Sequence, residues 1–141
     1  MNAKNVLVRS LQLLEAGNAR EWCDLFHPDG ILEFPYAPLG WETRFEGREV
    51  IWKHMQKFPE YLTVRFTEVN FYETTDPNMA IGEFHGDGLA TVTGRKFEQD
   101  YISVLWTKDG QIMRYRDFWN PLRHLDALGG VEAAAKIVQE G

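Results

Sequence analysis

Apolar positions near the start of the chain recur with the period of a helix. The apolar residues between Val6 and Leu14 cluster on one side of a 3.6-residue helix, which Gly17 and Asn18 end. Asn18 can cap a second short helix, because Glu21 follows three positions later as in a capping box. The pattern therefore predicts two initial helices, and the second carries Trp22, Leu25 and Phe26.

The next segment mixes turn-forming residues with short elements. Residues 27–30 (HPDG) predict a turn, and residues 31–36 (ILEFPY) predict a short strand that Pro35 breaks. Residues 37–47 are typical of a loop or irregular hairpin whose aromatic side chains point back toward the core. A third helix is expected over residues 48–58.

After Pro59 the period changes to the alternation of β-strands. Four strands are expected, over residues 62–74, 79–93, 96–108 and 111–120. Asn120 then caps a helix whose first residue is Pro121, a position that suits proline. Two glycines end this helix, and residues 131–140 predict a last one.

Helices first and strands later predict an α+β fold in a single domain over residues 1–141. We expect a strongly curved mixed or antiparallel sheet that wraps around the N-terminal helices and forms a cone with an internal cavity. Aromatic residues make up 13% of the chain, which is enough for some rings to line a pocket.

Charge and cysteine content narrow the possible partners. The net charge is -6 and no basic cluster is visible, which argues against nucleic acid and anionic membranes. A single cysteine, Cys23, excludes an intrachain disulfide and a cysteine-rich metal site. The N-terminal residues lack a signal-peptide pattern, and no segment has the about 20 apolar residues that cross a bilayer. We expect a cytoplasmic protein.

Asp117 is the first catalytic candidate, because it is a carboxylate within a run of aromatic residues. If Met113, Tyr115, Asp117 and Trp119 share one face of the last strand, that face is mostly apolar. Desolvation would then raise the pKa of Asp117 and suit it to acid–base catalysis. The alternative is that Asp117 pairs with Arg114 or Arg116 at the rim.

Further candidates lie on neighbouring strands. Glu83 and His85 stand two residues apart, so a Glu–His pair could orient the imidazole as a base. Alternatively they lie on the solvent or dimer face. Tyr101 could donate a hydrogen bond to a carbonyl oxygen, since only one of Asp100 and Tyr101 can face the cavity.

Ligand contacts are expected from the helices, the first loop and the last strand. The expected substrate-binding residues are Trp22, Phe26, Tyr36, Trp41, Trp52, Met55, Glu83, Tyr115 and Trp119, with Trp41 at the mouth. The histidines lack metal-ligand spacing, so we expect no metal site, and His124 is expected to be exposed.

Several stretches resemble one known family. These are FEGREVIWKHMQKFP, NFYETTDPN, GEFHGDG, FEQDYISV and KDGQIMRYRDFWNPLRHLDALG, which together cover about positions 45 to 130. The chain resembles the SnoaL-like and ketosteroid-isomerase-like superfamily, which shares the cone-shaped fold of nuclear transport factor two. Within it, the chain looks most like the phenazine biosynthesis protein A/B family.

This resemblance implies a homodimer without metal or cofactor, with a pocket between sheet and helices. In the phenazine family an acidic residue in the segment that corresponds to YRDFWNP acts as an acid/base, and this role carries over to Asp117. We also expect a dimer because an open sheet face with Phe66, Phe71 and Trp106 would expose a large apolar patch.

Three functions remain open from the sequence. The first is a small enzyme that binds a cyclic metabolite and catalyses isomerisation, cyclisation, dehydration or condensation through Asp117, aided by His85 or Tyr101. The second is a binding or dimerisation module without catalysis. The third is epoxide hydrolysis, for which Arg65, Asp100 and Asp117 would have to converge.

Overall fold

Six helices and six strands follow one another in the computed structural model, which describes residues 2–140. The order is α1 (Ala3–Glu15), α2 (Ala19–Asp24), β1 (Phe26–Glu33), β2 (Arg44–Glu46), α3 (Arg48–Met55), α4 (Phe58–Tyr61), β3 (Leu62–Tyr72), β4 (Met79–Ala90), β5 (Arg95–Lys108), β6 (Gln111–Trp119), α5 (Pro121–Ala127) and α6 (Val131–Glu140).

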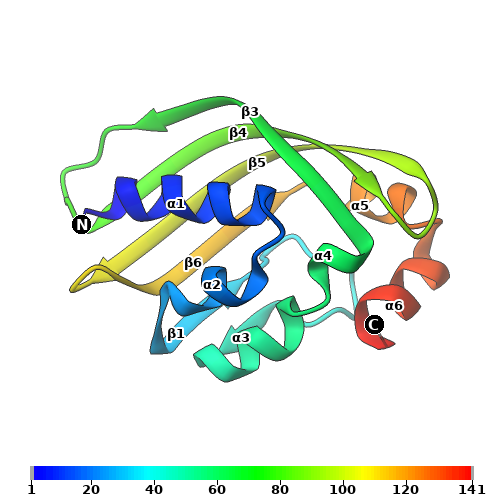
Figure 1. Ribbon diagram of the computed structural model, residues 1–141, viewed down its shortest axis with the longest axis horizontal. Helices are drawn as coiled ribbons and strands as arrows, with labels where there is room; N and C mark the ends of the chain where they lie inside the picture. Colours follow the sequence, from blue (N-terminus) through cyan, green and yellow to red (C-terminus); the bar gives the residue numbers. More distant parts are fainter. Residues whose placement is uncertain (1, 141) are drawn as a thin grey trace.

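The strands form one mixed sheet in the order β2-β1-β6-β5-β4-β3. Only the pairing of β1 with β6 is parallel, and the other neighbours are antiparallel. Figure 1 shows the long strands arching over α1, with α2 and α3 on the same side of the sheet and with α5 and α6 at one end. The predicted α+β class with a curved sheet around N-terminal helices is confirmed.

The predicted helix caps are present. The Asn18 side chain accepts a hydrogen bond from the Glu21 backbone N–H, and the Asn120 side chain accepts one from the Leu122 N–H. Pro121 is the first residue of α5. These contacts satisfy N–H groups that the first turn of a helix leaves without partners. The short-range chemistry of the sequence therefore locates the starts of α2 and α5.

The first strand begins earlier than predicted. Phe26 belongs to β1 and not to α2, and the expected turn at residues 27–30 lies inside the strand as an irregularity of its pairing with β6. The His27 Nδ1 accepts a hydrogen bond from the Asp29 N–H at 3.0 Å within this irregular segment. Gly30 fits there because a Cβ would lie 2.7 Å from the Ile112 carbonyl oxygen.

Two apolar clusters stabilise the fold. One joins α1, α2 and α3 to the sheet, and includes Leu7 and Phe26. The other joins α4 and the C-terminal helices to the ends of β3–β5, and includes Leu62 and Leu128. Cys23 is buried in the first cluster, and burial raises the pKa of its thiol to about 12. No helix within residues 2–140 has the length and apolar character needed to span a membrane.

The apolar patch that was expected on the open sheet face does not form. Phe66 lines the internal cavity, and Phe71 packs against the first apolar cluster. Trp106 lies beneath the Arg114 guanidinium, whose carbon is 5.4 Å from the ring centroid. The argument for a dimer from these three residues is therefore wrong, and the dimer itself stays a prediction.

Candidate active site

The concave side of the sheet encloses a cavity of about 440 Å³ where the two apolar clusters meet. Its wall is mostly aromatic, with contributions from the helices, the loop between β1 and β2, and the inner faces of β3–β6. This volume is in the range of pockets that hold small organic ligands. The titratable side chains on this wall can fix the orientation of a ligand; they are Glu42, Lys53, His54, Tyr61, Tyr101, Tyr115, Asp117 and His124.

Asp117 is the carboxylate of this cavity. It lies directly opposite Ser103 in the antiparallel pairing of β5 with β6, and the Ser103 hydroxyl donates to Asp117 Oδ1 at 2.9 Å. The Tyr115 hydroxyl donates to Ser103 Oγ at 3.3 Å. Tyr115, Asp117 and Trp119 all line the cavity, so the predicted shared face of β6 is confirmed for these three residues. Met113 does not line the cavity, because the register of β5 and β6 shifts at its position.

Burial raises the pKa of Asp117 from 3.8 to about 7, although the hydrogen bond from Ser103 acts in the opposite direction. Desolvation disfavours the charged form of a carboxyl group, and no cation among the described residues pairs with Asp117 to offset this effect. Near neutral pH both the acid and the carboxylate are therefore populated. This is the protonation behaviour that a general acid–base group needs.

The alternative pairing of Asp117 with the arginines of its own strand is wrong. Arg114 and Arg116 point to the opposite face of the sheet, where both approach the Glu33 carboxylate. The hydrogen bond from Arg114 lowers the pKa of Glu33. Alternation along β6 thus separates these guanidinium groups from Asp117.

Tyr101 lines the cavity on the next strand, as predicted. Its ring stacks on Phe84, with centroids 5.1 Å apart. Burial and, secondarily, the charge of Asp117 raise the pKa of Tyr101, so its hydroxyl keeps its proton. Gly86 leaves room for this ring, because a Cβ at that position would lie 2.8 Å from Tyr101 Cε2.

Five of the predicted contact residues lie on the cavity wall beside Asp117 and Tyr101. These are Trp22, Trp41, Met55, Tyr115 and Trp119. The indole N–H of Trp22 is buried without a hydrogen-bond partner among the described residues.

Three other predicted contact residues lie elsewhere. Phe26 is enclosed in the first apolar cluster, and Trp52 lies beneath the Arg20 guanidinium. Tyr36 is 60% exposed and packs edge-on against Phe118. Short-range pattern cannot separate core, cavity and surface positions for such rings, because all three environments accept them.

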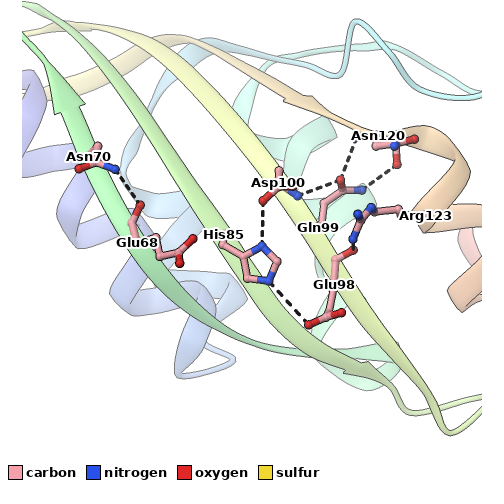
Figure 2. Close-up of polar contacts among 8 residues, drawn as sticks. All are labelled: Glu68, Asn70, His85, Glu98, Gln99, Asp100, Asn120 and Arg123. Atoms are coloured by element: carbon pink, nitrogen blue, oxygen red, sulfur yellow. Dashed lines mark hydrogen bonds and ion pairs between the residues drawn. The ribbon is translucent and has the colours of Figure 1, made fainter.

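The expectation that Glu83 and His85 share the cavity with Asp117 is wrong. Phe84 faces the cavity, so alternation along β4 directs its two neighbours to the outer face. There the His85 Nδ1 lies 2.8 Å from Asp100 Oδ1, and its Nε2 lies 3.9 Å from Glu98 Oε1 (Figure 2). The hydrogen bond with Asp100 raises the pKa of His85.

The constellation required for epoxide hydrolysis is not assembled. Arg65 is exposed opposite Asp87 in the pairing of β3 with β4, and Asp100 pairs with His85 on the outer face. Only Asp117 of the three required residues faces the cavity. Among the side chains that the structure describes, no group of three or more His, Cys, Asp or Glu residues is arranged to hold a metal ion.

Two histidines of the cavity wall were missed by sequence reasoning. His54 of α3 stacks on Phe45, and His124 of α5 stacks on Trp119. His124 was expected to be exposed, but it lies four residues before the buried Leu128, which caps the C-terminus of α5 and whose N–H donates to the His124 carbonyl, so both residues lie on one side. That spacing is a signal that could have found it.

The chain is similar in sequence to a known domain family and to several known bacterial proteins. The SnoaL-like domain family matches residues 7–115. An uncharacterised PhzA/B-like protein of Pseudomonas aeruginosa is 78% identical over 139 residues, which cover 99% of both chains. The phenazine biosynthesis protein PhzA1 of the same organism is 37% identical over 113 residues, 74% of this chain and 67% of its own.

A solved structure agrees with these matches. A candidate isomerase from Bacillus subtilis has a TM-score of 0.87 and 37% sequence identity to this chain. The alignment covers 92% of this chain and 94% of the Bacillus protein.

Proposed function

Because the chain belongs to the SnoaL-like domain family, and within it to the PhzA/B-like proteins, we propose that it is a cofactor-independent acid–base enzyme. Its substrate is a small cyclic metabolite with a carbonyl group, bound in the aromatic cavity. The reaction is an isomerisation, cyclisation, dehydration or condensation. The observation that carries this proposal is Asp117, an enclosed carboxyl group with a pKa of about 7 and, within the part of the chain that the structure describes, no cationic partner.

The chemistry follows from the two protonation states of Asp117. The carboxylate removes a proton from a carbon next to the carbonyl group, and the C–H electrons form an enolate. The resulting acid returns the proton to the same or another carbon, which in the second case moves a double bond. Ser103 holds Oδ1 of the carboxyl group, which leaves Oδ2 to exchange the proton.

Tyr101 supports this reaction as a hydrogen-bond donor. Its raised pKa keeps the hydroxyl protonated, so it can donate to the carbonyl oxygen as negative charge develops there. The hydroxyl has no hydrogen-bonding partner of its own among the described residues. The surrounding rings exclude water and strengthen this hydrogen bond.

Proton exchange tests the proposal without knowledge of the product. A panel of cyclic ketones is incubated with the protein in heavy water, and deuterium uptake next to the carbonyl group is followed by NMR. Asp117→Asn keeps the shape of the side chain and an acceptor for Ser103, but it cannot exchange a proton. We expect about 10²- to 10⁴-fold slower exchange.

Asp100→Asn is the matched control, because it makes the same change on the outer face of the adjacent strand. We expect wild-type exchange from it. An Asp117→Asn protein that exchanges as fast as the wild type would instead support the second candidate, a module that only binds a ligand in its apolar cavity.

The proposal includes a cytoplasmic homodimer with no nucleic-acid or membrane partner. The net charge of -6 supports the absence of polyanionic partners. Light scattering at micromolar concentration tests the dimer, and a monomer mass would contradict it.

A further inference from the structure

Tyr115 and Asp117 lie on the same face of β6, and Ser103 of β5 connects their side chains. The Ser103 hydroxyl donates to Asp117 Oδ1 at 2.9 Å, and the Tyr115 hydroxyl donates to Ser103 Oγ at 3.3 Å. Ser103 is completely buried, and Tyr115 is 2% exposed. We call these three side chains the Asp117 network.

The direction of both hydrogen bonds follows from the number of protons in the Asp117 network. A serine hydroxyl has one proton, and Ser103 donates it to the carboxyl oxygen of Asp117. The hydrogen bond between Tyr115 and Ser103 must then use the tyrosine proton. Burial and the charge of Asp117 raise the pKa of Tyr115, so its hydroxyl keeps this proton. Donation by Tyr115 also polarises the Ser103 hydroxyl and strengthens the hydrogen bond that Ser103 donates.

Packing holds the Tyr115 ring in place for this hydrogen bond. The ring centroid lies 5.8 Å from that of Trp22 and 6.2 Å from that of Phe26, within the first apolar cluster. Tyr101 differs, because its ring stacks on Phe84 and its hydroxyl makes no hydrogen bond to Ser103 or Asp117. The two tyrosines next to the cavity carboxyl group therefore have different surroundings.

We propose that Tyr115 is a positioning residue for Asp117. Its hydroxyl directs the Ser103 hydroxyl toward Oδ1, which keeps the exchangeable proton of the carboxyl group on Oδ2. The inference rests on the proposed function, because it takes Asp117 as the acid–base group. It gives the two tyrosines different tasks, since Tyr101 donates to the ligand and Tyr115 acts on the carboxyl group through Ser103.

The other titratable groups of the cavity wall leave the Asp117 carboxyl group unaffected. These are Glu42, Lys53, His54, Tyr61, Tyr101 and His124. Besides burial, Ser103 is the one described residue that shifts the pKa of Asp117. A change in the titration of Asp117 after substitution of Ser103 or Tyr115 therefore reports on the Asp117 network.

NMR titration of the Asp117 carboxyl carbon tests this assignment without any ligand. The signal is identified by its loss in Asp117→Asn. Ser103→Ala removes the donor to the carboxylate, and we expect the pKa of Asp117 to rise by about one pH unit. Tyr115→Phe removes one oxygen atom and keeps the packed ring, and we expect the pKa of Asp117 to rise by about half a pH unit.

The double variant distinguishes an action through Ser103 from a direct action of Tyr115. When Ser103→Ala is already present, Tyr115→Phe should cause no further change in the pKa of Asp117. Tyr101→Phe is the matched control, because it removes the other tyrosine hydroxyl that the charge of Asp117 influences. We expect the pKa of Asp117 in this control to stay within about 0.2 pH units of the wild-type value. Near-ultraviolet circular dichroism verifies that each variant is folded.

A Tyr115→Phe protein in which Asp117 titrates as in the wild type would overturn the proposal. An equal effect of Tyr115→Phe with and without the Ser103 hydroxyl would also overturn it. The carboxyl titration needs no substrate, so its outcome does not depend on the deuterium-exchange assay. If exchange is found and its pH midpoint stays constant while the carboxyl pKa rises, the proposed function is wrong and the positioning role of Tyr115 is retained.

Discussion

The two faces of the sheet use the same residue types in opposite ways. Arg116 and Asp117 are neighbours on β6, yet the arginine approaches Glu33 on the outer face whereas the aspartate faces the aromatic cavity. Histidines show the same contrast. Hydrogen bonding to Asp100 raises the pKa of His85 outside, and burial lowers the pKa of His54 inside.

The difference lies in the partners that each face provides. On the outer face, Arg114 pairs with Glu33 and His85 pairs with Asp100, and these partners of opposite sign favour the charged forms of Arg114, Glu33 and His85. Inner titratable groups have rings around them, which favours the uncharged form of Asp117 and of both cavity histidines. The inner arrangement costs stability, as is common where a site is built for function and not for folding. Measurements of stability against pH can therefore test the contrast directly.

The largest effect is expected at Asp117. Its folded pKa of about 7 exceeds the unfolded value of 3.8, so the folded protein binds the proton more tightly and loses stability as pH rises from about 4 through 7. Asp117→Asn removes this loss. Relative to wild type, we expect the variant to gain about 4 kcal/mol of unfolding free energy between pH 4 and pH 8, measured by urea denaturation.

Asp87→Asn makes the same substitution on an exposed position of β4. Its unfolding free energy is expected to follow the wild type within about 0.5 kcal/mol at all pH values. A pH-independent difference between Asp117→Asn and wild type would show that the Asp117 carboxyl group is hydrated, and the contrast between the two faces would fail.

A smaller effect of opposite sign is expected from the cavity histidines. Their folded pKa values of about 4 lie below the unfolded value of 6.5, so their contribution is fully present above pH 6.5 and is lost as pH falls toward 4. His54→Phe and His124→Phe each retain the stacked ring without the proton site. At pH 5 we expect either variant to gain about 2 kcal/mol over wild type, relative to the difference at pH 8.

Proton-detected NMR titration of the imidazoles gives an independent measurement of the same quantity. Signals of His54 and His124 should remain those of neutral rings to about pH 5. Titration of either ring near pH 6.5 would mean that water reaches that part of the cavity wall. The phenylalanine variants should then show no gain in unfolding free energy over wild type at pH 5.

The sequence predicted those features that short-range chemistry determines. Asn18 and Asn120 predicted the first residues of α2 and α5, because asparagine is a common helix cap. The alternation of residues along β6 placed Tyr115, Asp117 and Trp119 on one face. The start of β1 was missed because its irregular pairing with β6 depends on a strand more than eighty residues away. Residues 27–30 contain no local pattern that indicates pairing with β6.

The error at His85 has a different cause. The alternation along β4 predicts a strand, but it does not indicate which face of that strand is inward. Three of the six inner positions of β4 are glycines and two are alanines, whereas Ile81 lies on the same face as Glu83 and His85. Glycines at inner positions are required by rings of other strands, such as Tyr101 against Gly86. A pattern of apolar residues cannot reveal an inner face whose apolar contacts come from elsewhere.

The smallest effect is expected at His85 itself, and it completes the comparison. Its folded pKa is raised above 6.5, so its stabilising contribution is present below that pH and is lost as pH rises through the folded value. The Asp100 side chain is 74% exposed, and exposed ion pairs contribute little. We expect His85→Gln to lose less than about 1 kcal/mol of unfolding free energy at pH 5.5 and almost none at pH 9.

Asp100→Asn should lose a similar amount of unfolding free energy. The double variant should lose no more than either single variant, because one ion pair is removed in all three. A larger loss at pH 9 than at pH 5.5 would show that the ring, and not its charge, stabilises the outer face.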